Sequence, residues 1–131
     1  MLNPNQFQIN EAWIAFKLND APVATGSDGN FNLVALMDAA SCFILGSALV
    51  PTSETEPSKL EARRLLKQAK VHKQQLPTTL FIPDNLPASL FTVEAERQGI
   101  AVVLVPEDQL LLFVGEARAD FKERFSGGGI Q

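Results

Sequence analysis

Apolar residues in the first third of the chain follow the patterns of strands. Residues 12–18 (AWIAFKL) alternate and contain large apolar side chains, which is typical of a strand with one buried face. Residues 31–37 and 42–50 are apolar runs joined by a short connection, so they can pair as an antiparallel hairpin. Residues 19–30 collect Asp, Pro and Gly, which favour a loop or hairpin connection. The sequence therefore predicts a three-stranded antiparallel meander.

The middle of the chain predicts two helices separated by a short strand. Ser58 and Glu61 have the spacing of a capping box, so we expect a helix to start here and to end near Lys73. Its expected buried residues are Leu60, Leu65, Leu66 and Ala69. Residues 78–82 are a β-type run, and residues 87–98 are expected to form a second helix, because they begin with a proline and are followed by a glycine.

The last third predicts one more strand and one more helix. Residues 100–105 are continuously apolar, the pattern of a parallel strand buried on both faces. A third helix is expected to run up to residue 125, because apolar residues recur at every fourth position. These are Phe113, Ala117, Phe121 and Phe125. Residues 109–114 are apolar enough to be a strand instead, so the sequence leaves their type open.

The expected order of elements is βββαβαβα. Antiparallel pairing first and parallel crossovers later predict an α/β fold with a mixed five-stranded sheet and helices on both faces. Residues 1–125 are expected to form one domain, since a chain of 131 residues that is 46% hydrophobic builds one core. The glycine-rich residues 126–131 are expected to be a mobile tail.

Composition excludes several classes of protein. The apolar runs are shorter than the roughly 18–20 residues that a bilayer requires, so we expect no membrane span. The first residues lack a basic segment and a long apolar stretch, which predicts a cytoplasmic protein without a signal peptide. Cys42 and His72 are the single cysteine and histidine, which excludes an intrachain disulfide and a cysteine-based zinc site.

Four segments resemble the catalytic cores of retroviral-type integrases and transposases, which belong to the ribonuclease H-like superfamily. They are Trp13 in the first strand, LVALMDAASCFILGSALVP across the hairpin, EARRLLKQA in the first helix and TLFIPDN at the end of the fourth strand. The resemblance extends over residues 11–125. The segment TTLFIPDNLPASLFTVEAERQGIAVVLVPED also resembles a group of uncharacterised bacterial domains. These resemblances imply a ribonuclease H-like fold and a bacterial source.

Active members of the superfamily use carboxylates to hold two divalent metal ions, which activate a water and stabilise the leaving oxygen. The resemblance places these carboxylates in the middle of the first strand, at the end of the fourth and on the last helix. Asp84 matches the second position, and Asp120, or Glu116 one turn earlier, matches the third. Phe16 stands at the first position and cannot ligate a metal.

Two other acidic residues lie near the first position. Asp20 is about 13 Å from residue 16 at ~3.3 Å per residue, too far for the same metal, and Asp38 matches an acidic position that is not a ligand in integrase-like sequences. We therefore expect no metal, no cofactor and no catalytic residue, a buried Phe16 under the last helix, and Asp84 as a cap of the second helix or its preceding turn. If the chain is an enzyme, its catalytic residues are Asp84, Asp120 and Glu116.

Six of the eleven basic residues lie on the first helix: Lys59, Arg63, Arg64, Lys67, Lys70 and Lys73. Clustered cations can bind the phosphates of nucleic acid. The net charge of -4 and the lack of interleaved aromatic residues favour an ordinary solvated face instead. We therefore expect a protein partner in preference to nucleic acid.

The remaining reactive residues are interpreted as structural. Cys42 lies in an apolar run and Ser41 lacks a GxSxG context, so neither is expected to be a nucleophile. Residues 26–29 (GSDG) predict a turn, and Glu94 and Glu96 point in different directions on their helix.

The sequence as a whole predicts a non-catalytic ribonuclease H-like domain that binds a partner. A metal-dependent nuclease or integrase-type enzyme is the first alternative. The second is a small-ligand domain whose site lies at the carboxyl ends of strands four and five, near Asp84 and Pro106.

Overall fold

The structure is a computed structural model that describes residues 1–24 and 29–126. Of the expected tail, residues 126–131, only residue 126 is described. Of the expected turn, residues 26–29, only residue 29 is described. The elements, in chain order, are η1 (Pro4–Gln6), β1 (Ala12–Lys17), β2 (Val23–Ala24), β3 (Asn30–Asp38), β4 (Ile44–Pro51), α1 (Lys59–Lys73), β5 (Thr79–Pro83), α2 (Ser89–Arg97), β6 (Ala101–Val105), η2 (Glu107–Leu110) and α3 (Leu111–Ser126).

The strands form one mixed sheet, as the order of elements predicts. The path runs β2-β3-β1-β5-β6, and β4 pairs with β3. Pairing is antiparallel among β1 to β4 and parallel for β1 with β5 and β5 with β6. The sequence missed the two-residue strand β2, which adds a sixth strand to the described sheet.

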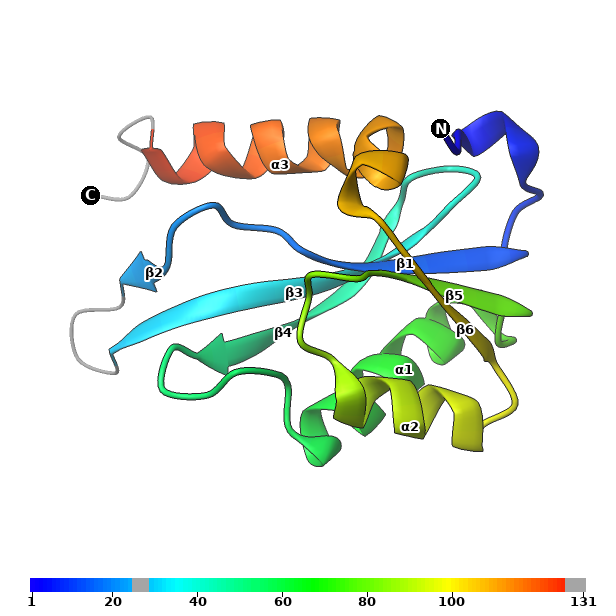
Figure 1. The fold of residues 1–131 in the computed structure, drawn as a ribbon, viewed down its shortest axis with the longest axis horizontal. Coiled ribbons are helices and arrows are strands. Elements are labelled where there is room, and N and C mark those ends of the chain that lie inside the picture. The colour runs from blue at the N-terminus through cyan, green and yellow to red at the C-terminus, as the bar shows by residue number, and fades with distance from the viewer. Residues whose placement is uncertain (25–28, 127–131) are drawn as a thin grey trace.

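Helices cover both faces of this sheet, with α1 and α2 on one side and α3 on the other (Figure 1). The alternation of β1 decides which side chain enters which core. Trp13 and Ala15 pack with the buried residues of α1 and α2, whereas Ile14 and Phe16 pack with Phe113 under α3. These four β1 side chains are fully buried because β1 is central, so the prediction of a strand with a single buried face is wrong. The predicted burial of Phe16 is confirmed.

Helix α1 confirms its predicted start and corrects one core residue. The Ser58 Oγ accepts the N–H of Glu61 at 3.1 Å, the first half of a capping box, while the Glu61 carboxylate pairs with Arg64. The prediction for Leu60 is wrong, since its side chain is 73% exposed and Ala62 is buried in its place. Leu60 lies ~200° around the helix axis from Ala62 and so faces away from the sheet.

Two further expectations fail for reasons of tertiary structure. Strand β6 is not buried on both faces, since Val103 and Leu104 are exposed. The reason is its position as the last strand of the sheet. Asp84 caps neither α2 nor the turn before it, because its side chain makes no hydrogen bond with the described residues. The first turn of α2 is instead capped by a residue distant in sequence: the Glu56 carboxylate accepts the N–H of Leu90 at 2.7 Å. Residues 109–114, left open above, are helical, divided between η2 and α3.

Candidate functional site

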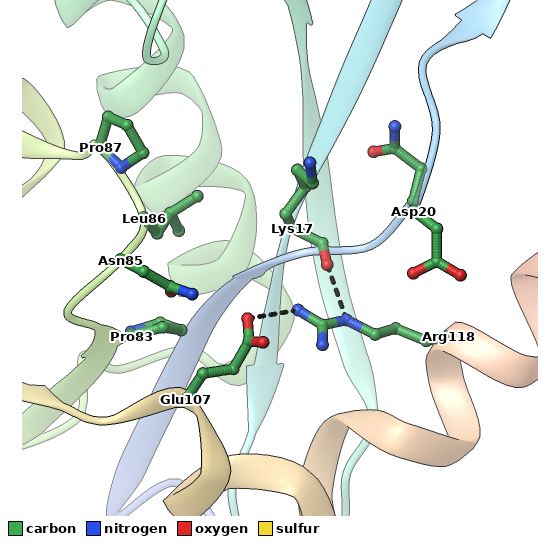
Figure 2. Close-up of a pocket in the computed structure, with 9 residues that line it drawn as sticks. Lys17, Asp20, Pro83, Asn85, Leu86, Pro87, Glu107 and Arg118 are labelled. Carbon is green, nitrogen blue, oxygen red and sulfur yellow. Dashed lines mark hydrogen bonds and ion pairs between the residues drawn. The ribbon is translucent and has the colours of Figure 1, made fainter.

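A polar pocket of about 300 Å³ lies where the carboxyl ends of β1 and β5 meet the start of η2 and one flank of α3. The β5–α2 loop forms one wall, and α3 contributes the side chain opposite it (Figure 2). Its lining residues are Lys17, Asn19, Asp20, Pro83, Asn85, Leu86, Pro87, Glu107 and Arg118. This is the edge of the sheet at which open α/β folds place their ligands.

Arg118 is the central charged group of this pocket. Its Nε donates to the backbone carbonyl of Lys17 at 2.9 Å, and its Nη2 pairs with a Glu107 carboxylate oxygen at 3.2 Å (Figure 2). The guanidinium carbon lies 5.9 Å from the centre of the Phe16 ring, a distance at which a cation is attracted to an aromatic face. The Arg118 side chain is 20% exposed, so these contacts hold it against the protein.

The loop after β1 is fixed by a buried amide. The Asn19 Oδ1 accepts the N–H of Leu33 at 2.8 Å, and its Nδ2 donates to the carbonyl of Ala21 and to Asn32. Asn19 is 3% exposed, and its three partners satisfy its amide. The neighbouring Asp20 is thereby placed on the pocket wall, where Figure 2 shows it on the same side as Arg118.

The residues of this pocket do not fit a pair of divalent metal ions. The side chain that the resemblance aligns with the central ligand is Phe16, which is fully buried and apolar. The Arg118 guanidinium lies over its ring and repels cations. Among the residues that the structure describes, no group of three or more His, Cys, Asp or Glu side chains could hold a metal.

The structure does not bring Asp84, Glu116 and Asp120 together. Asp84 follows β5 and is exposed, and its backbone N–H donates to the Val105 carbonyl at 2.8 Å. Glu116 and Asp120 are exposed on α3 and line a different pocket of about 470 Å³, which faces the β3–β4 connection. Glu107, which does enter the polar pocket, was missed because nothing in the local pattern distinguishes it from a residue of a surface turn.

Asp38 has a structural role. Its carboxylate is fully buried and accepts the Asn10 N–H at 2.6 Å, the Ser41 N–H at 2.9 Å and the Ser41 hydroxyl at 2.8 Å. Asn10, held at a positive φ of 63°, in turn accepts the indole N–H of Trp13 at 2.7 Å. This network ties the start of β1 to the β3–β4 turn.

Glu94, which the sequence does not favour as half of a catalytic pair with Glu96, is a buried carboxylate. Its carboxylate bonds Arg63 of α1 at 2.9 Å and also bonds Arg97 and Gln98 of its own helix region. These donors, Arg97 first, lower the pKa of Glu94 from 4.5 to about 2 despite the opposing effect of burial. One cation of the basic helix, Arg63, therefore joins α1 to α2, while Arg97 pairs with Glu94 within α2.

Cys42 and the single histidine do not form a catalytic pair. Cys42 is half-buried in the β3–β4 turn, and burial, with the nearby negative charges of Asp38 and Glu116, raises the pKa of its thiol. His72 instead stacks on Phe43, with ring centres 5.0 Å apart. Raised pKa values keep thiols protonated and weakly nucleophilic.

Comparison with known proteins identifies the fold. No protein-family model and no curated protein match the chain. Solved structures do match. The catalytic domain of Mos1 mariner transposase has a TM-score of 0.58 and 13% identity, and the match covers 89% of this chain and 61% of that one. The catalytic core domain of BIV integrase has a TM-score of 0.57 and 13% identity, and the match covers 90% of this chain and 70% of that one. A chain of the simian T-cell lymphotropic virus intasome, solved in complex with PP2A regulatory subunit B56 gamma, is also similar. Its TM-score is 0.56 and its identity 14%, and the match covers 100% of this chain and 45% of that one.

These similarities establish a ribonuclease H-like fold of the integrase and transposase type. The chain spans less than half of the intasome chain and 61% of the transposase domain. Within the described residues no helix is both long and apolar enough to cross a membrane.

Proposed function

We propose that this chain is a non-catalytic ribonuclease H-like module that acts by binding another protein. The observation that carries the proposal is the contact of Arg118 with Phe16 at the position where the resemblance implies a metal centre. A buried phenylalanine supplies no oxygen ligand, and a guanidinium already provides positive charge. The arrangement stabilises the packing of α3 on β1 and does not leave carboxylates converging on an open site.

A protein partner is supported by strongly exposed apolar side chains and by the net charge of the chain. Leu60, Val71, Val93 and Leu104 are each more than 60% exposed on α1, α2 and β6. Burial of such side chains against a partner would remove apolar surface from water, which favours association. The excess of acidic residues, 15 against 11, does not favour a polyanionic partner.

Metal titration tests the non-catalytic part of this proposal. We expect millimolar Mg²⁺ or Mn²⁺ to leave the melting temperature unchanged, because only a ligand that prefers the folded state stabilises it. We also expect no metal-dependent cleavage of single- or double-stranded DNA. A Mn²⁺ shift that disappears in an Asp84→Ala, Asp120→Ala variant, accompanied by cleavage, would establish the nuclease alternative.

One observation favours the small-ligand alternative as a second candidate. The polar pocket lies beside Asp84 and Pro106, where the sequence expected such a site, and its volume is at the lower end of the range for ligand sites. A thermal-shift screen of small polar metabolites tests this candidate. A hit that is lost in Asn85→Leu and kept in Asn5→Leu, a surface control, would support it; the absence of any hit would remove it.

The setting that we propose is the cytoplasm of a bacterium, with residues 1–125 acting as one domain. A single half-buried cysteine is compatible with a reducing compartment. Fractionation of the source cells and limited proteolysis of the chain test these two points.

A further inference from the structure

Strand β6 is paired on one side only. It ends the path of the sheet after β5, with five consecutive parallel register positions from Thr79↔Ala101 to Pro83↔Val105. No described segment pairs with its outer edge. In Figure 1, β6 runs along this side of the sheet from near α2 toward the start of α3.

The bonds to β5 determine which backbone groups of β6 remain outward. The Ala101 N–H donates to the Thr78 carbonyl at 3.0 Å, and the Val105 carbonyl accepts the Asp84 N–H at 2.8 Å. Since a parallel ladder uses every second residue of each strand, the N–H and C=O groups of Val102 and Leu104 point away from β5. These four groups have the spacing that another strand requires.

The side chains of β6 do not protect this edge. The strand reads AVVLV and contains no charge, glycine or proline, and its register with β5 is regular. Val103 is 40% exposed and Leu104 is 61% exposed, on opposite faces of the sheet. Natural edge strands are usually blunted by charges, prolines or bulges.

The outer strand at the opposite side of the sheet does carry such devices. The pairing of β4 with β3 contains a register shift, and β4 ends at Pro51. A guanidinium nitrogen of Arg64 also lies 3.5 Å from the Ser47 carbonyl. The chain therefore protects one edge strand and leaves the other accessible.

We propose that β6 binds an extended segment of a partner protein as an added strand. This inference rests on the protein-binding function proposed above and assigns a surface to it. The segment would pair its backbone with Val102 and Leu104 and place apolar side chains against Val103 and Leu104. Exposed Asp108 lies three residues beyond the end of β6, so a lysine or arginine at the adjacent end of the segment would complement its charge.

The length of the edge favours a short segment over a second copy of this chain. A five-residue strand is about 17 Å long and offers only two residues with outward backbone groups. Stable dimers bury roughly 1,200–2,000 Å², more than two paired five-residue strands supply. A short peptide needs less area, because in strand addition the main-chain bonds give much of the affinity.

The test selects random heptapeptides displayed on phage against the whole chain and measures the enriched peptides by fluorescence anisotropy. Leu104→Pro removes one outward N–H and none of the bonds to β5, and proline is tolerated at such a position. We expect it to weaken binding at least about tenfold, the effect of losing one hydrogen bond and its neighbouring contacts. Leu104→Val keeps the N–H and an apolar side chain, so its affinity should stay within about threefold.

Two measurements keep this test decisive. Leu104→Lys introduces an edge charge without a proline and should also weaken binding, so the result does not depend on one variant remaining folded. Amide hydrogen exchange should show Val102 and Leu104 exchanging quickly in the unbound chain and slowly in the complex. Failure to enrich any peptide, or equal binding to the Leu104→Pro and wild-type chains, would overturn the proposal.

The remaining outcomes separate this inference from the function on which it rests. Peptides that protect amides elsewhere would refute the β6 edge and leave a protein-binding module standing. A wild-type dimer that Leu104→Pro converts to monomer would show that a second copy occupies the edge, and would overturn the peptide. Metal-dependent cleavage would refute the non-catalytic function whatever the peptides do.

Discussion

Truncation of Phe16 is the most informative single perturbation of this fold. The ring is fully buried in the core between β1 and α3, in contact distance of the Phe113 cluster and beneath the Arg118 guanidinium. Phe16→Ala leaves a cavity that the central strand cannot close, because β1 is held by β3 and β5 on either side. The expected loss is about 3–5 kcal/mol of unfolding free energy.

That loss is large relative to the total stability of a small domain, which is about 5–15 kcal/mol. At roughly 3–6 °C per kcal/mol for a chain of this size, the melting temperature should fall by about 10–30 °C. Urea unfolding followed by circular dichroism measures the free energy, and calorimetry measures the melting temperature. Phe43→Ala is the matched control: this phenylalanine is 52% exposed, so its loss should cost about 1 kcal/mol or less.

A second substitution at the same position tests the reasoning about function. Phe16→Asp places a carboxylate in an apolar core. The nearby cation, Arg118, is already bonded to the Lys17 carbonyl and to Glu107, so the substitution should prevent folding, with no gain of cleavage. The reasoning would be refuted by a soluble, folded Phe16→Asp chain that binds Mn²⁺, because position 16 would then be a ligand position that needs only its carboxylate. A Phe16→Ala chain as stable as the wild type would equally contradict the packing argument.

Two further predictions concern buried polar groups. The lowered pKa of Glu94, about 2, means that its contribution to stability is complete above about pH 4.5 and is lost as the pH falls toward 2. In Glu94→Gln, the free energy of unfolding should therefore depend less on pH between these two values. An unchanged pH dependence would exclude the ion pairs of Glu94 as its cause. Asp38→Ala leaves the N–H groups of Asn10 and Ser41 without their acceptor and should cost about 1–3 kcal/mol in urea unfolding, whereas Asp20→Ala, at the pocket wall, should change stability by about 0.5 kcal/mol or less.

Much of the fold could be predicted from local pattern. The alternation of residues 12–18 predicted a strand, with Phe16 buried under the last helix, and the structure places Phe16 and Ile14, two residues apart on β1, together under α3. Ser58 and Gly99 marked helix ends that the structure confirms, with Gly99 at a positive φ of 90°. These features depend on backbone angles and side-chain direction over a few residues, which the neighbouring sequence determines.

The candidate site and the open edge were decided only by the tertiary structure. Arg118 meets Phe16 across about a hundred residues of sequence, and Glu56 caps a helix that begins 33 residues later. The apolar run of β6 matched a strand buried on both faces, yet its position at the end of the sheet exposes Leu104. A periodic pattern records which residues share a face, but what covers that face depends on the path of the whole chain, because burial and pairing are contacts between segments that are distant in sequence.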